Sequence, residues 1–296
     1  MDVIGRRKVF YAASGAFFVV SLAAVALFGL NFGIDFTGGA LVEVEFTGER
    51  PATAELLERV RSLGFGEARL QPAGERGVIL RLRHLSEEEH RAVLAAIGAP
   101  RELSFNTVGP SIGQELQRRS ALAVALVILF IVSYVAWAFR KVSQPVASWK
   151  YGVATVVALA HDVVIPTGLV AVAGRFWAVE VNTLFVTAIL TILGFSVHDT
   201  IVVFDRIREN LRRQKGTGSD FGAVVNRSVN ETFVRSLNTS LTVVLAMAAV
   251  ALFGGATTKT FALTLIAGVA IGTYSSIFIA SPLLVSWHQW NAKRKA

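Results

Sequence analysis

The sequence predicts an α-helical polytopic membrane protein with six transmembrane helices and one small α+β domain between the first two helices. Hydrophobic residues make up 53% of the 296 residues and charged residues only 17%, which is too little polar surface for a water-facing globule. Six apolar stretches approach the roughly 20 helical residues that cross a bilayer. Between the first two stretches, apolar and polar residues alternate as they do in soluble domains, and the continuous apolar pattern is interrupted.

The first apolar stretch follows a short basic run and resembles a secretory signal. It extends from Val9 to Leu30, however, which is longer than a typical signal core, so we expect an uncleaved first span. The six predicted spans are residues 9–28, 121–139, 151–172, 182–204, 237–253 and 261–287.

Basic residues predict the orientation of these spans, because cytoplasmic loops are enriched in Lys and Arg. Six spans place both termini on one side. The short connections on the opposite side carry only Arg175 and Lys259. We therefore expect cytoplasmic termini and a cytoplasmic loop at 205–236. The cations on that side are Arg6, Arg7, Lys8, Arg140, Lys141, Lys150, Arg206, Arg208, Arg212, Arg213, Lys215, Arg227, Lys293, Arg294 and Lys295.

Residues 31–117 predict a periplasmic or extracellular domain with the order βαββαβ, which is typical of a ferredoxin-like fold. Ser86 precedes three glutamates and predicts a helix start. The expected strands are 40–46, 68–71, 78–83 and 102–107, the first helix is 53–63, and the turn is 74–77. The expected divisions of the chain are 1–30, 31–117, 118–290 and the cytoplasmic tail 291–296.

Two carboxylates fall inside the predicted spans, where a charge costs several kcal/mol. Asp162 lies eleven residues into the third span, about 16 Å along a helix and so near the bilayer midplane. Asp199 lies near the cytoplasmic end of the fourth span, before Asp205. Either carboxylate is a proton-binding group or a structural residue that bonds to a neighbouring helix or to interfacial water.

A basic partner for Asp199 is available, because Arg235 precedes the fifth span at a comparable depth. Protonation of a carboxylate that faces an arginine removes their attraction and lets helices move, so this pair predicts a proton relay. Alternatively, Arg235 is an ordinary basic flank of the span. The polar start of the fifth span favours a wet cavity; its polar residues are Asn238, Thr239, Ser240 and Thr242.

The sequence predicts neither a catalytic site nor a metal site. His161 and His198 each precede one of these aspartates, but adjacent helical residues point about 100° apart and do not chelate together. His198 could tune Asp199 or pass protons, although a packing role is the alternative. With zero cysteines, thiolate chemistry is excluded, and the basic residues follow membrane topology and not a nucleic-acid face.

Small residues in the last span predict close helix packing without a direct functional role. They are Gly268 and Gly272, with Ser275 and Ser276 beyond them. Near the first span, Gly38-Gly39 predicts a turn into the exported domain.

Four segments resemble the SecF branch of the SecD/SecF family of bacterial protein-export subunits. The resemblance covers essentially the whole chain, and the segment in the fourth span is highly specific. In the first segment, the signature positions are Gly33, Asp35, Gly38 and Gly39. The segments are residues 32–39, 158–162, 196–210 and 230–242.

This resemblance implies a member of the resistance-nodulation-division superfamily in the bacterial inner membrane, with SecD as the other six-span half. It implies that the proton motive force drives protein export without a cofactor, and that Asp199 and Arg235 take part in proton transport. One departure is His198, where the family usually has Asn; either the relay is tuned differently here or the position is permissive. The implied partners are SecD, the SecYEG translocon, YajC, YidC and the exported unfolded polypeptide.

Two other functions remain to be weighed. Half of a proton-driven exporter of lipid or drug would fit the superfamily, but an exported domain of only about 85 residues argues against it. A passive scaffold would make Asp199 and Arg235 dispensable. Separately, the cytoplasmic loop from Ile207 to Asn230 is either a surface amphipathic helix or a basic connection, and its cations predict attraction to anionic lipid, at about 1 kcal/mol per cation.

Overall fold

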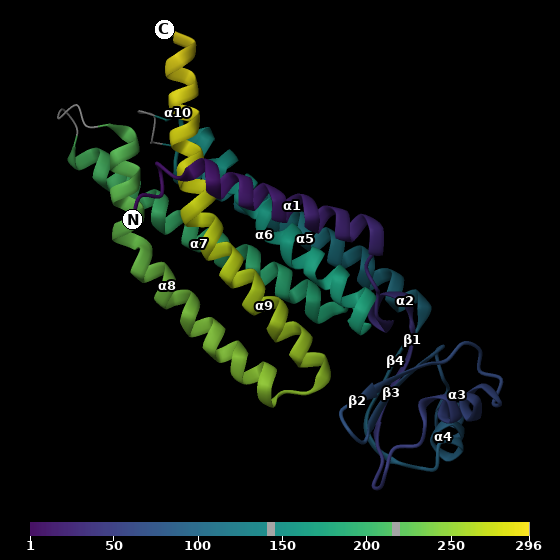
Figure 1. Cartoon of the computed structure of the whole chain (residues 1–296). Helices are drawn as coiled ribbons and strands as arrows, with labels where there is room; N and C mark the ends of the chain where they lie inside the picture. The colour runs from purple at the N-terminus through teal and green to yellow at the C-terminus, as the bar shows by residue number, and fades with distance from the viewer. Residues whose placement is uncertain (141–145, 215–219, 296) are drawn as a thin grey trace. The chain divides into compact units, whose positions relative to one another are not determined.

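The computed structural model describes residues 1–140, 146–214 and 220–295. The chain forms two compact units, which Figure 1 displays with their helices and strands. The first, called the helical unit, comprises Met1–Asn31, Ala123–Val179 and Leu184–Ala296. The second, called the sheet unit, comprises Phe32–Leu122 together with Glu180–Thr183. Lys141 and Lys215, two of the cations that support the predicted orientation, lie outside the described residues.

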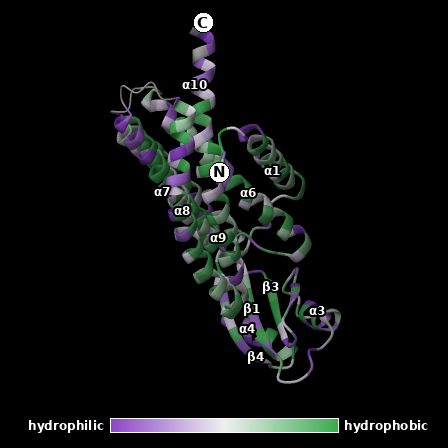
Figure 2. Cartoon of the chain, turned by 60° about the vertical axis from the view of Figure 1, so that its left-hand side comes forward, coloured by the Kyte–Doolittle hydropathy of each residue, from purple (hydrophilic) through white to green (hydrophobic). Residues whose placement is uncertain are grey.

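Within the described residues, six helical segments are long and apolar enough to cross a membrane, in agreement with the predicted number of spans. Figure 2 shows hydrophobic residues along these helices and hydrophilic residues gathered where α7 ends and α8 begins. The first five segments are α1 (Arg7–Phe28), α5 (Pro110–Ala138), α6 (Ser148–Trp177), α7 (Thr183–Arg213) and α8 (Phe221–Phe253). The sixth combines α9 (Ala256–Ser275), the π-helical turn η1 (Ser276–Ala280) and α10 (Ser281–Lys295).

The predicted connection at 205–236 is helical over most of its length, which favours the helical one of the two alternatives for residues 207–230. Helix α7 continues to Arg213, and α8 begins at Phe221, where the Asp220 side chain accepts a hydrogen bond from the Ala223 amide. The last turns of α7 and the first turns of α8 contain many polar residues, so hydropathy alone does not identify them as helical. Instead of facing lipid, several bond across the two helices: Asn210 Nδ2 donates to Ser228 Oγ at 2.9 Å. Residues 215–219 of this segment lie outside the described residues.

Two helix irregularities fall beside the predicted carboxylate Asp162. Pro166 lies inside α6 and has no N–H to donate to the carbonyl of residue 162, four positions earlier. In the sixth segment, η1 interrupts α-helical hydrogen bonding between α9 and α10. Single π-helical turns of this kind are frequent at functional sites.

Small residues allow close packing inside the helical unit, as the sequence predicts. A Cβ added to Gly168 of α6 would lie 2.6 Å from Cα of Ser21 in α1. A Cβ added to Gly272 of α9 would lie 3.1 Å from Cβ of Ser196 in α7. Helices α8 and α9 run side by side, as do α1 and α6 (Figure 1). Close approach brings the polar residues of α6, α7, α8 and α9 within hydrogen-bonding reach.

The sheet unit contains one antiparallel sheet with the strand order β2-β3-β1-β4. Along the chain its elements follow the predicted order of strand, helix, two strands, helix and strand. In β1, burial alternates along the strand, with Ala40, Val42 and Val44 fully buried in the core. The elements are β1 (Gly39–Glu45), α3 (Thr53–Arg61), β2 (Arg69–Ala73), β3 (Gly77–Leu82), α4 (Glu87–Ala96) and β4 (Arg101–Val108).

Helix α4 begins where the sequence predicts. The Ser86 hydroxyl accepts a hydrogen bond from the Glu89 amide, and the Glu89 carboxylate accepts one from the Ser86 amide, which forms a capping box. Leu56 and Val60 of α3 and Val93 of α4 pack into the core beneath the sheet. The sheet unit therefore has a hydrophobic core of its own.

Candidate functional site

Asp162 is completely buried in the helical unit and is surrounded by hydroxyl donors. Its Oδ2 accepts hydrogen bonds from Ser196 Oγ of α7 at 2.5 Å and from Ser275 Oγ of α9 at 2.6 Å. Its Oδ1 lies 2.9 Å from His161 Nδ1. One carboxyl group thus connects three helices, and both of its oxygens have partners.

Asp199 lies on α7 and is also buried, with 5% of its surface exposed. Its Oδ1 accepts a hydrogen bond from Ser236 Oγ of α8 at 2.5 Å. Its Oδ2 has no hydrogen-bond partner among the described residues. An ionised carboxylate pays a large desolvation cost for a buried oxygen without a partner, so this oxygen is a position where a proton or a cation would be stabilised.

Further hydroxyl pairs link the same helices on either side of these carboxylates. Thr200 Oγ1 of α7 lies 2.9 Å from Ser276 Oγ, at the start of η1. Ser240 of α8 bonds to Thr273 of α9. Hydroxyl groups both donate and accept, so such pairs can reorient when a neighbouring carboxyl gains or loses a proton. We call the two carboxylates and these bonded hydroxyls the buried polar cluster.

Arg235 lies on the exposed surface of α8 and forms no ion pair with Asp199 in the part of the chain that the structure describes. It is nevertheless near enough to act on the charge of Asp199 electrostatically, as is His198, which is also exposed. The other predicted residues of α8 divide between two faces. Ser240 is buried in the cluster, while Asn238, Thr239 and Thr242 are exposed on the Arg235 side.

Sequence reasoning missed the serines that contact the carboxylates. Ser236 follows Arg235 directly and takes the position beside Asp199 that was expected for the arginine. Ser275 was assigned to helix packing, and Ser196 was not singled out. A usable signal was present for Ser196, because it precedes Asp199 by three residues and therefore shares its helix face. The described residues contain no group of three His, Cys, Asp or Glu side chains suited to a metal.

Close contacts within the sheet unit explain why the signature segment contains glycines. It forms the short helix α2 (Ile34–Thr37), and Gly38 and Gly39 follow with φ of +74° and +133°. A Cβ on Gly38 would lie 2.9 Å from Pro110 Cα, and one on Gly39 would lie 2.7 Å from the Leu82 carbonyl oxygen. Both the backbone conformation and the available space therefore favour glycine.

Asp35 of the signature segment caps the first residue of α7. Its Oδ2 accepts hydrogen bonds from the Thr183 amide at 2.9 Å and from Thr183 Oγ1 at 2.6 Å. A negative charge at a helix N-terminus is favourable because it satisfies free amides and the helix dipole. Nearby, Glu180 pairs with Arg81, and burial raises the pKa of the Glu180 carboxyl although the Arg81 charge acts in the opposite direction.

Family profiles match this chain in two regions. The profile described as protein export membrane protein SecD/SecF, C-terminal, matches residues 90–290. The profile of the SecD/SecF GG motif matches residues 23–48, which include Gly38 and Gly39.

Curated relatives and solved structures agree with these profiles. The chain is 43% identical to "Protein translocase subunit SecF" of Thermobaculum terrenum, over 97% of this chain and 94% of that protein. It is 40% identical to the SecF subunit of Anaerolinea thermophila, with the same coverage of both chains. The crystal structure of SecDF from Thermus thermophilus superposes with a TM-score of 0.84 at 33% identity, covering 98% of this chain and 39% of that one.

Proposed function

Because the chain belongs to the SecD/SecF family of protein-export membrane proteins, we propose that it pairs with SecD to couple proton flow to late steps of protein export. The observation that carries this proposal is the buried polar cluster, with two carboxyl groups inside apolar helices. Buried intramembrane carboxyl groups commonly mark proton paths. No cofactor is required, because the energy would come from the proton motive force.

In this mechanism Asp199 binds and releases the proton. With a proton on Oδ2, the carboxyl is neutral and its bond to Ser236 of α8 keeps the two helices together. After proton release, the carboxylate attracts Arg235, and α8 would have to turn to bring the guanidinium inward. Asp162 and its serines would then respond across α6, α7 and α9, because α7 carries Ser196 as well as Asp199. His198 acts on the Asp199 charge from the exposed side.

The exposed polar face of α8 supports pairing with a second six-span half. Arg235, Asn238, Thr239 and Thr242 repeat at helical spacing and would be costly against acyl chains. We propose that SecD covers this face and completes a polar cavity. A relative from Brucella abortus, named "Protein translocase subunit SecDF", matches 89% of this chain with 34% of its own length, so in that protein the matching region is part of one longer chain.

We further propose the topology that the sequence predicts. The integral membrane unit would lie in the bacterial inner membrane with both termini in the cytoplasm, and the sheet unit, as a ferredoxin-like domain, would lie outside. There it could meet the unfolded polypeptide that leaves SecYEG. YajC and YidC remain proposed neighbours. The basic turns around α7 and α8 would contact anionic lipid.

Replacement of Asp199 by Asn tests the proton step. The amide preserves size and an acceptor for Ser236 but does not titrate, so we expect gradient-driven export to fall to the level without a gradient. Asp205→Asn is the matched control, since Asp205 is an exposed carboxylate of the same helix that pairs only with Arg208 among the described residues. Export of a reporter protein into inverted membrane vesicles, with and without a proton gradient, gives the comparison.

Retained gradient-driven export in the Asp199→Asn protein would refute the proton mechanism and favour a scaffold. Gradient-dependent efflux of lipid or drug, with protein export unaffected by either substitution, would favour the exporter alternative. Both readings require the variant to be inserted at the wild-type level, which quantitative blotting of the vesicles checks.

A further inference from the structure

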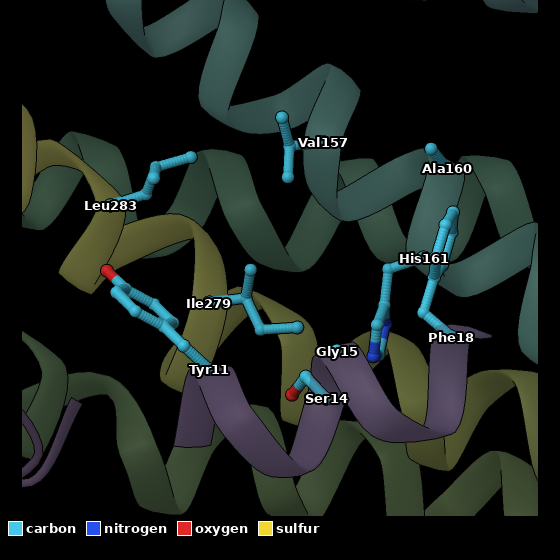
Figure 3. A pocket seen from close by; sticks show the side chains of 9 residues that line it. All are labelled: Tyr11, Ser14, Gly15, Phe18, Val157, Ala160, His161, Ile279 and Leu283. Atoms are coloured by element: carbon cyan, nitrogen blue, oxygen red, sulfur yellow. The ribbon is translucent and has the colours of Figure 1, made fainter. Parts of the chain in front are cut away.

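A cavity of about 460 Å³ lies within the helical unit and borders the buried polar cluster at His161, whose Nδ1 lies 2.9 Å from Asp162 Oδ1. Figure 3 shows α1 on one side and α6 on the other, with Ile279 of η1 and Leu283 of α10 closing one end. Val157 is 43% exposed, so the cavity opens to the outer surface of the helices. Its lining residues are Tyr11, Ser14, Gly15, Phe18, Val157, Ala160, His161, Ile279 and Leu283.

The few polar groups of the lining are already bonded to other residues. Tyr11 Oη lies 3.1 Å from Ser286 Oγ, Ser14 Oγ donates to Tyr274 Oη at 3.1 Å, and His161 Nδ1 contacts Asp162 at 2.9 Å. A water molecule needs about two to four polar partners to remain in a cavity, and this wall offers few. The cavity therefore suits an apolar occupant.

Two cations lie beyond the end of the cavity nearest the chain termini. Arg7 precedes Tyr11 by one turn of α1, and Lys150 precedes Val157 by two turns of α6, so each shares a face with a lining residue. Lys150 is buried, with its Nζ 5.3 Å from the ring centre of Trp287, one turn beyond Leu283.

Neither cation is paired with a carboxylate among the described residues. Arg7 donates only to neutral oxygens, at 3.1 Å to the Ile4 carbonyl and 2.5 Å to Gln289 Oε1. The interactions that the structure records for the Lys150 ammonium are with the rings of Trp149 and Trp287. Arg7 contacts a different face of α10 from Lys150, so Lys150 alone, as an ammonium without an anionic partner in the described part of the chain, favours a phosphate at this end of the cavity.

We propose that this cavity binds one acyl chain of an anionic phospholipid, with the lipid phosphate held by Lys150. The apolar wall matches the chain and the Lys150 ammonium matches the headgroup. A cavity of 460 Å³ is in the range of small-ligand sites, whereas a partner helix about 10 Å across would not enter it. Trp149 and Trp287 are residues that favour the level of lipid headgroups, which places the phosphate there. Because His161 joins the cavity to Asp162, the experiments below measure lipid labelling, which does not require the proposed proton step.

Photo-crosslinking tests the position of the chain. The full-length protein is placed in nanodiscs that contain phosphatidylcholine and a phosphatidylglycerol with a diazirine on one acyl chain, and adducts are mapped by mass spectrometry. We expect the strongest labelling within residues 11–18 and 157–161. Equal labelling of the lipid-exposed faces of α5 and α8 would mean general bilayer contact and would overturn the proposal.

Gly15→Leu tests whether the cavity itself holds the chain. A Cβ at Gly15 meets no atom within 4 Å, and Gly15 lines the cavity, so we expect a Leu side chain there to occupy cavity space. Gly194→Leu of α7 is the matched control, because a Cβ there is equally free and Gly194 is not part of the lining. We expect Gly15→Leu to abolish the 157–161 adduct and Gly194→Leu to retain it; an adduct that persists in Gly15→Leu would overturn the proposal.

Lys150→Met tests the headgroup contact separately, because Met keeps the length of the side chain but not its charge. In competition between unlabelled phosphatidylglycerol and phosphatidylcholine for the site, we expect the preference for phosphatidylglycerol to fall about tenfold, the effect of one charge-assisted hydrogen bond. An unchanged preference, or none in the wild-type protein, would refute the headgroup assignment. Circular dichroism and gel filtration exclude misfolded variants from both experiments.

Discussion

At the scale of single residues, Asp162 and Asp199 differ in how completely their oxygens are bonded. Two serine hydroxyls and one imidazole nitrogen surround Asp162, whereas one oxygen of Asp199 has no partner among the described residues. Full bonding holds a carboxyl in one position, and incomplete bonding leaves it responsive to a proton or an approaching cation. We therefore expect Asp199 to change its contacts and Asp162 to transmit the change between helices.

Asp162→Asn and Ser275→Ala together separate a proton role of Asp162 from a structural one. Each removes part of the same hydrogen-bond network, so we expect both to destabilise the protein by about 1–3 kcal/mol. Only Asp162→Asn removes a titratable group. We expect gradient-driven export to be lost in Asp162→Asn and retained in Ser275→Ala, as measured in inverted vesicles beside thermal unfolding in detergent.

The structural alternative makes the opposite prediction for export. If Asp162 only holds helices together, the two variants should lose export in proportion to their loss of stability. Ser281→Ala provides a baseline, because its hydroxyl donates to the main-chain carbonyl of Ser276 within the same helical segment.

At the scale of single elements, local signals decide how well the sequence predicts a boundary. Ser86 and Glu89 define the start of α4 by their own hydrogen bonds, and β1 shows its buried face through residue alternation, so both elements were predictable. The start of α8 was not. Its first turns are rich in polar residues that bond to α7, such as Ser228, and hydropathy detects only the part of a helix that faces lipid.

The capping residue of α4 also predicts a pH dependence. The hydrogen bond from Arg83 and the amide of Ser86 lower the pKa of Glu89 to about 2, from an ordinary value of 4.5. In the unfolded chain, Glu89 therefore binds a proton near pH 4.5. In the folded chain, it binds this proton only near pH 2. The contribution of Glu89 to stability is complete above pH 4.5 and is lost as the pH falls toward 2.

Hydrogen-exchange protection of the α4 amides, measured in the full-length protein from pH 5 to 2, checks this expectation. Protection should fall in the wild-type protein and should change less in Glu89→Gln, because Gln can still accept the hydrogen bond of a capping box without titrating. Glu88→Gln should retain the wild-type fall. A steep fall in Glu89→Gln would assign the acid sensitivity to other groups.

At the scale of the whole molecule, α7 belongs to both units. Its first residue, Thr183, lies in the sheet unit and is capped by Asp35, and Asp199 lies further along the same helix in the helical unit. A continuous helix transmits rotation and translation along its length. In the proposed mechanism, the signature segment would therefore connect a movement of α7 at Asp199 to the start of that helix at Thr183.

Asp35→Ala tests this connection. Loss of an N-cap side chain costs about 1 kcal/mol, which is too little to unfold the protein but enough to loosen the start of α7. We expect reduced export at a given proton gradient, while the response to Asp199→Asn remains. Thr37→Val is the control, because among the described residues the Thr37 hydroxyl bonds only to the carbonyls of Gly33 and Gly38. Wild-type export by Asp35→Ala would show that the cap plays no part in coupling.

The sequence identified the acids of the candidate site but not their partners. Asp162 and Asp199 stand out because charges are rare in apolar spans, and this signal depends on one residue at a time. Ser196, Ser236 and Ser275 are ordinary residues of membrane helices, and their role depends on which helices pack together. Helix rotation, which only the folded structure fixes, turned Ser236 and not Arg235 toward Asp199.

The π-helical turn η1 has a geometrical consequence for the last span. A π-turn accommodates one residue more than an α-turn, which shifts the angular phase of everything that follows by about 100°. Through this offset, Ser275 before the turn points to Asp162, and Leu283 after it borders the cavity beside α1. Deletion of one residue from η1 would restore an uninterrupted α-helix and swing α10 out of alignment, so the length of this five-residue turn determines which neighbours the end of the chain meets.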